Sequence, residues 1–179
     1  FHLGKIYSDY LADYDSSSFY LYNIINKYPK NTLFLYQCAI THLMDRDLTN
    51  AEKLLNKVIS LNNKYFTQTT AFAYFLKGDI YFRRNNYEKA IENYKKFFDL
   101  TKVTDYLGIA NFRLSFCYEM LNKDSESSKS LASVSLGNDD IQDDIYAKNE
   151  GKKIKEYGWS NDRKTIMVAN NYLEAGVYD

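Results

Sequence analysis

Apolar side chains recur at helical spacing along this chain, and short polar stretches interrupt the pattern. The clearest case is the segment 71–100. Its apolar positions run through Tyr74, Gly78 and Tyr81, and a polar break follows at residues 83–86. A second run then occupies Tyr87, Ala90, Ile91, Tyr94, Phe97 and Phe98. The pattern predicts two helices, the second beginning after Asn86, whose side chain suits a helix N-cap. Each helix has one apolar stripe, so each needs a neighbour to cover it.

The same frame recurs along the chain. Tyr7, His42, Tyr81 and Tyr118 take equivalent places in successive segments, and they lie 35, 39 and 37 residues apart. A recurrence of this length is typical of stacked structural repeats. The next residue that fits the recurring frame is Tyr172, which lies 54 residues after Tyr118. The interval leaves room for an additional helix, in which acidic residues near the start and lysines near the end suit the helix dipole.

The segment 71–100 resembles the tetratricopeptide repeat. That family has an aromatic residue, then Leu-Gly, then Tyr in the first helix, and a small residue followed by an aromatic in the second. Tyr74, Gly78, Tyr81, Ala90 and Tyr94 match these places. Lys77 departs from the pattern, because the family prefers Leu there. The resemblance implies an all-α fold in which antiparallel helix pairs stack as a right-handed solenoid.

We expect one array over residues 1–179, with about four repeats, one extra helix and truncated ends. The expected repeats are roughly 1–31, 32–65, 71–104 and 108–137. The extra helix is expected at 138–157. The start of a further repeat is expected at 162–179, with Ala169 in the glycine place.

Composition narrows the class of function. The chain has 179 residues, of which 45% are hydrophobic, with 23 basic and 23 acidic side chains. Hydrophobicity this high argues against a disordered chain, and zero net charge argues against a nucleic-acid partner. No apolar run approaches the roughly 18 residues of a membrane span. The compartment stays open: free cysteines would suit the cytoplasm, whereas the turn at 27–30 resembles bacterial envelope assembly proteins. The oligomeric state is open too.

No catalytic constellation is visible in the sequence. It contains no nucleophile elbow, no phosphate loop and no metalloprotease motif, so we expect neither an enzyme nor a cofactor. Cys38 and His42 are four residues apart and could share a metal, but both fall in core-facing places of the repeat. Packing is therefore the preferred interpretation, and no metal site is expected. Ser16, Ser17 and Ser18 are expected to cap a helix.

The resemblance implies that the first helix of each repeat lines a concave surface. We expect this surface to bind a protein partner that offers a peptide or an amphipathic helix. The alternative is a structural spacer or sensor array within a larger multidomain protein or envelope assembly complex. The candidate partner-binding residues are Tyr36, Ile40, Phe75, Asp79, Phe82, Arg83, Phe112 and Phe116.

Overall fold

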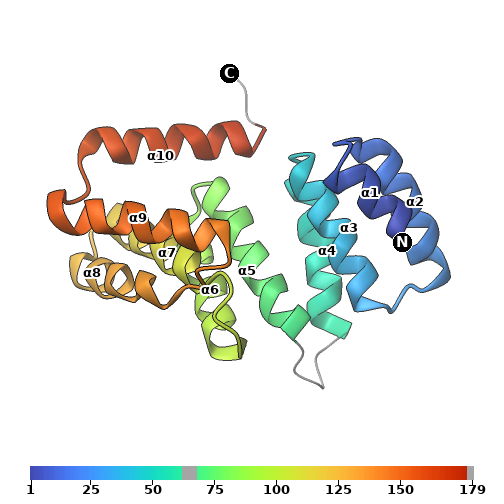
Figure 1. Cartoon of the computed structure of the whole chain (residues 1–179), viewed down its shortest axis with the longest axis horizontal. Helices are drawn as coiled ribbons and strands as arrows, with labels where there is room; N and C mark the ends of the chain where they lie inside the picture. The colour runs from blue at the N-terminus through green and yellow to red at the C-terminus, as the bar shows by residue number, and fades with distance from the viewer. Residues whose placement is uncertain (62–67, 177–179) are drawn as a thin grey trace.

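The computed structural model describes residues 1–61 and 68–176, and within them it is all α-helical (Figure 1). Parts of two expected repeats, 62–65 and 177–179, lie outside the described residues. The described helices are α1 (His2–Asp9), α2 (Tyr14–Lys27), α3 (Thr32–Met44), α4 (Leu48–Leu61), α5 (Gln68–Arg83), α6 (Tyr87–Leu100), α7 (Leu107–Met120), α8 (Asp124–Ser133), α9 (Gln142–Tyr157) and α10 (Asn161–Glu174), with a 3-10 turn at Val134–Leu136.

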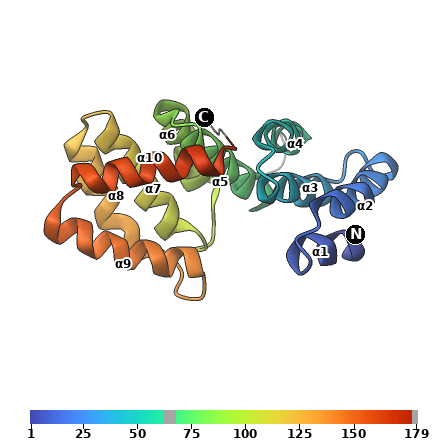
Figure 2. The ribbon, with the colours of Figure 1, turned by 90° about the horizontal axis from the view of Figure 1, so that it is seen from above.

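The helices form a helix-pair solenoid, as predicted. Four pairs follow one another along the long axis, from α1 and α2 at one end to α7 and α8 at the other (Figure 2). Two further helices lie beside the last pairs: α9 packs against α7, and the end of α10 reaches α5. Helix α10 lies where the start of a further repeat is expected, at 162–179.

The turn inside each pair explains the recurring frame. The carbonyls of His42, Tyr81 and Tyr118 each accept a hydrogen bond from the backbone N–H five residues later, at 2.8–2.9 Å. A residue with positive φ precedes each donor, namely Arg46, Asn85 and Asn122. This is the bonding pattern of a Schellman turn, which ends one helix and lets the chain reverse. These three frame residues therefore lie in the last turn of the first helix of their pair.

Short polar side chains begin the second helices. Asn86 accepts from the Lys89 N–H at 3.2 Å and caps α6, as predicted. Asp13 accepts from the Ser16 N–H at 3.0 Å and caps α2. The expectation that the serine cluster caps this helix is therefore wrong, because the cluster lies inside α2 and Ser17 is fully buried.

The core consists of two hydrophobic clusters that meet on α5. Ala73 and Ile80 of α5 belong to the N-terminal cluster, whereas Phe75 and Phe82 belong to the C-terminal one. Because these residues lie on different faces of a single helix, α5 joins the two halves of the solenoid.

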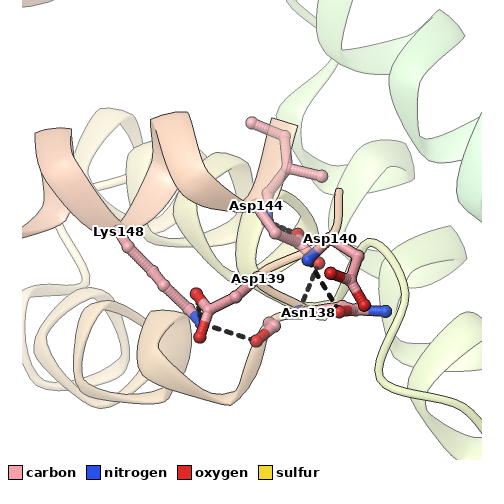
Figure 3. A network of polar contacts seen from close by, with 7 residues as sticks. Asn138, Asp139, Asp140, Asp144 and Lys148 are labelled. Atoms are coloured by element: carbon pink, nitrogen blue, oxygen red, sulfur yellow. Dashed lines mark hydrogen bonds and ion pairs between the residues drawn. The ribbon is translucent and has the colours of Figure 1, made fainter. Parts of the chain in front are cut away.

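A buried carboxylate fixes α9 against α7 (Figure 3). Asp144 of α9 is fully buried and accepts the backbone N–H groups of Ile109 and Asn138, each at 2.8 Å. Burial raises the pKa of the Asp144 carboxyl, while the backbone N–H groups that bond to it oppose that rise. Lys148 donates to the Gly137 carbonyl and to Asp139, both at 2.7 Å. The carboxylate supplies the N-terminus of α7 with the acceptor that its own N-cap residue, Tyr106, does not provide.

Candidate functional site

Five of the eight candidate residues line one pocket on the first helices. The pocket has a volume of about 280 Å³ and lies between α3, α5, the residue before α7 and the start of α9. The candidates that it brings together are Tyr36, Ile40, Phe75, Asp79 and Arg83. We call this space the α3–α5 pocket.

The floor of the α3–α5 pocket is aromatic and aliphatic. Phe75 is 4% exposed, and the Tyr106 ring stacks on it with a centroid distance of 5.0 Å. Burial raises the pKa of the Tyr36 hydroxyl, so this group stays neutral at physiological pH. At the rim, Met44 is 44% exposed. An apolar side chain entering the pocket would therefore contact apolar atoms on several sides.

Three of the four charged side chains of the pocket, Asp79, Arg83 and Arg113, have ion-pair partners within the chain. Asp79 accepts the Tyr94 hydroxyl at 2.7 Å and pairs with Arg113 at 2.5 Å. Although burial opposes a charge on Arg113, the neighbouring Asp79 raises the pKa of its guanidinium. Arg83 pairs with Glu174 of α10 at 3.2 Å. These ion pairs fix the shape of the pocket wall.

The other three candidates lie beneath the C-terminal helices and not in the α3–α5 pocket. Phe82, Phe112 and Phe116 are 5%, 3% and 0% exposed. Trp159, in the connection from α9 to α10, packs on Phe112 and Phe116 with centroid distances of 5.5 and 5.2 Å. Phe82 and Phe112 border a second pocket of about 220 Å³ under α10. The chain itself thus covers this part of the predicted groove.

Six further residues line the α3–α5 pocket and are not among the candidates: Leu43, Met44, Leu76, Tyr106, Arg113 and Asp143. Arg113 carried a usable signal, because it is a charge inside an otherwise apolar helical stretch. Tyr106 carried none. It precedes α7 with a φ of +63°, and only the folded chain turns its ring onto Phe75.

The cysteine and histidine considered for a metal are occupied in packing and hydrogen bonding. Cys38 is fully buried, and burial raises the pKa of its thiol to about 12. His42 Nε2 lies 3.0 Å from the Tyr22 hydroxyl, and Nδ1 lies 3.1 Å from Asp47. Across residues 1–61 and 68–176, no three side chains of the metal-binding types cluster together. In the same ranges, none of the helices combines the length and the apolar character needed to cross a membrane.

Comparisons with known proteins agree with this fold. A family model described as the tetratricopeptide repeat matches residues 71–102, and no curated protein matches the chain. Among solved structures, a crystal structure of MamA is similar with a TM-score of 0.64 and 16% identity, covering 97% of this chain and 94% of that one. A second MamA structure has a TM-score of 0.63 and 16% identity, with coverages of 98% and 91%. The predicted resemblance is confirmed: the chain carries a tetratricopeptide repeat at residues 71–102 within a helix-pair solenoid, the fold of a protein–protein interaction and scaffold module.

Proposed function

We propose that the chain binds a peptide segment or an amphipathic helix of a partner protein through the α3–α5 pocket. The observation that carries the proposal is the convergence of Tyr36, Ile40 and Phe75 on one cavity of about 280 Å³. A volume of this size is at the low end for binding sites, so it suits an anchoring side chain of a partner better than a whole small molecule.

The energetics favour an apolar anchor. Burying apolar surface contributes roughly 25 cal/mol per Å², before the cost of ordering the partner is subtracted. Asp79 and Arg83 are held by ion pairs within the chain, so they can orient a polar group of the partner without first reorganising. Because these charges serve structural ion pairs, we propose a binding role for the pocket and not a catalytic one.

The test compares two exposed apolar residues of the same helix. Peptides are first selected from a displayed random library against the whole chain, and their affinities are then measured for Met44→Gln and Leu33→Gln. Met44 lines the pocket, whereas Leu33 is 52% exposed at the other end of α3. We expect Met44→Gln to weaken binding about tenfold, which is about 1.4 kcal/mol, and Leu33→Gln to leave it unchanged.

Ile40→Gln, inside the pocket, should weaken binding at least as much. Circular dichroism melts show whether each variant remains folded. Selected peptides that bind both pocket variants as tightly as the parent would refute the proposal and favour a spacer role.

A further inference from the structure

The fourth charged side chain of the α3–α5 pocket is Asp143, in the first turn of α9. It is exposed, and it makes no hydrogen bond or ion pair with another side chain in the described part of the chain. Arg113 lies in the same pocket, but its guanidinium pairs with Asp79. The pocket therefore presents one carboxylate that no ion pair with another described residue neutralises.

The surroundings of Asp143 carry an excess of negative charge. The α3–α5 pocket and the pocket of about 220 Å³ under α10 share Arg113 and Asp143 in their linings, so Asp143 lies where the two pockets adjoin. Glu174, the ion-pair partner of Arg83, lines the second pocket. Three carboxylates, of Asp79, Asp143 and Glu174, therefore accompany only two guanidinium groups in the linings of these pockets.

The charge of Asp143 acts on the apolar lining of the α3–α5 pocket. Burial raises the pKa of the Tyr106 hydroxyl, and the negative charge of Asp143 raises it further. The Tyr106 ring stacks on Phe75 with a centroid distance of 5.0 Å, and both residues line the pocket. An anchoring side chain that contacts Phe75 therefore brings the neighbouring residues of its own peptide close to Asp143.

The packing of α9 holds the backbone of Asp143 in place. The next residue, Asp144, is fully buried and accepts the backbone N–H groups of Ile109 and Asn138, each at 2.8 Å. Only the short side chain of Asp143 remains to be ordered when a partner binds. Because ordering mobile groups costs free energy on association, a carboxylate on a fixed backbone is suited to pair with an incoming charge.

We infer that the peptide bound in the α3–α5 pocket carries a basic residue beside its apolar anchor, a lysine or an arginine that pairs with Asp143. The inference rests on the binding role proposed above for this pocket. An acidic residue at the same place would be repelled by Asp143, and it would find Arg83 and Arg113 already paired. Charge complementarity thus selects a cationic and apolar segment as the occupant.

The test uses the whole chain and the displayed random library, keeping the selected peptides that Met44→Gln weakens. We expect these peptides to carry a lysine or an arginine close to an apolar residue. A fluorescein-labelled copy of one of them is titrated with the parent protein and its variants, and binding is followed by fluorescence anisotropy. Asp143→Asn should weaken binding about threefold, as expected for an exposed ion pair, and Asp143→Lys about tenfold.

Asp162→Asn is the matched control. Asp143 and Asp162 are both exposed aspartates in the first turn of a helix, so the two substitutions remove the same charge from the same kind of position. Asp162 lines neither of the two pockets, so its variant should bind the peptide like the parent protein. Thermal melts of every variant show that a loss of binding is not a loss of folding.

A second peptide, with glutamine in place of the basic residue, completes a double-mutant cycle. It should bind the parent about threefold more weakly than the first peptide, and Asp143→Asn should not weaken it further. Three results would overturn the inference and leave the binding role of the pocket intact: pocket-dependent peptides without a basic residue, equal binding of the first peptide to the parent and Asp143→Asn, and equal losses for Asp143→Asn and Asp162→Asn. Peptides that neither Met44→Gln nor Ile40→Gln weakens would instead overturn the proposed function itself.

Discussion

At Gly78, α5 and α6 approach so closely that a single added carbon has no space. A side-chain carbon there would lie 2.5 Å from the Tyr94 ring, which is fully buried and cannot move aside. Gly151 of α9 is different, since its nearest neighbour would be Val134 at 3.4 Å, an ordinary contact distance. The two glycines therefore differ. Gly78 is required by the close packing of α5 on α6, whereas Gly151 is not required by packing and only lowers the helix propensity of α9.

This contrast gives a paired prediction for alanine substitution. Gly78→Ala should lower the free energy of unfolding by about 1–3 kcal/mol, because overpacking displaces Tyr94. Gly151→Ala should raise it by about 0.5–1 kcal/mol, since alanine is favoured within a helix. Urea unfolding followed by circular dichroism measures both. A destabilising Gly151→Ala would show that the contact with Val134 is tighter than its distance implies.

At the scale of elements, Glu52 of α4 connects the second pair of helices to the third. It accepts hydrogen bonds from Tyr81 and Arg84, in α5 and the turn that follows it. Burial would raise the pKa of the Glu52 carboxyl, but these two donors outweigh burial and lower the pKa below its ordinary value of 4.5. The folded chain therefore holds the carboxylate more strongly than the unfolded chain does.

The direction of this shift predicts how stability depends on pH. The contribution of Glu52 is fully present above pH 4.5 and is lost as the pH falls through the lowered pKa of the folded state. Glu52→Gln should therefore cost about 1 kcal/mol or less at pH 7, and the difference from the parent should shrink in acid.

The control for Glu52 is Glu92→Gln, because Glu92 is 68% exposed and its contact with Lys96 is long, at 4.0 Å. Urea midpoints at several pH values between 3 and 7 measure the effect. If the loss of stability caused by Glu52→Gln is the same at every pH, the two donors do not stabilise the charged form of the Glu52 carboxyl.

At the scale of the whole molecule, the solenoid contains two hydrophobic clusters. Each is built from neighbouring helices, and α5 contributes side chains to both. The N-terminal cluster is built from α2 to α5, and the C-terminal cluster extends from α5 to α9, with side chains of α10 against it. In such arrays stability is approximately the sum of local terms and of contacts between neighbouring repeats. A destabilising substitution in one cluster should therefore lower the stability of that half of the chain more than the stability of the other half.

Leu55→Ala tests this expectation. Leu55 is fully buried in the N-terminal cluster, so its truncation should cost about 2–5 kcal/mol locally. The single tryptophan, Trp159, reports on the C-terminal cluster. We expect the urea midpoint from circular dichroism to fall more than the midpoint from tryptophan fluorescence. Leu61→Ala, at a 36% exposed leucine of the same helix, should change neither. Equal shifts of both probes would mean that α5 couples the clusters into one cooperative unit.

The sequence by itself determined the elements that depend on local chemistry. Apolar spacing defined the helices of each pair, and Asn86 marked the start of α6. The recurring frame at His42, Tyr81 and Tyr118 marked where first helices end, because the carbonyl of each of these residues closes the following turn. These contacts span only a few residues, so the pattern along the chain carries them.

Only the tertiary structure decided which surfaces remain open, because that outcome rests on contacts between distant residues. Asp144 reaches Ile109 across 35 positions, and Asn171 reaches the Phe82 carbonyl across 89. These two polar contacts place α9 and α10 over Phe112 and Phe116, which sequence reasoning assigned to an open groove. The same docking leaves the α3–α5 pocket open, with Tyr36, Ile40 and Phe75 in its lining. Helical periodicity identifies an apolar face, but the partner that covers it is set by the folded chain.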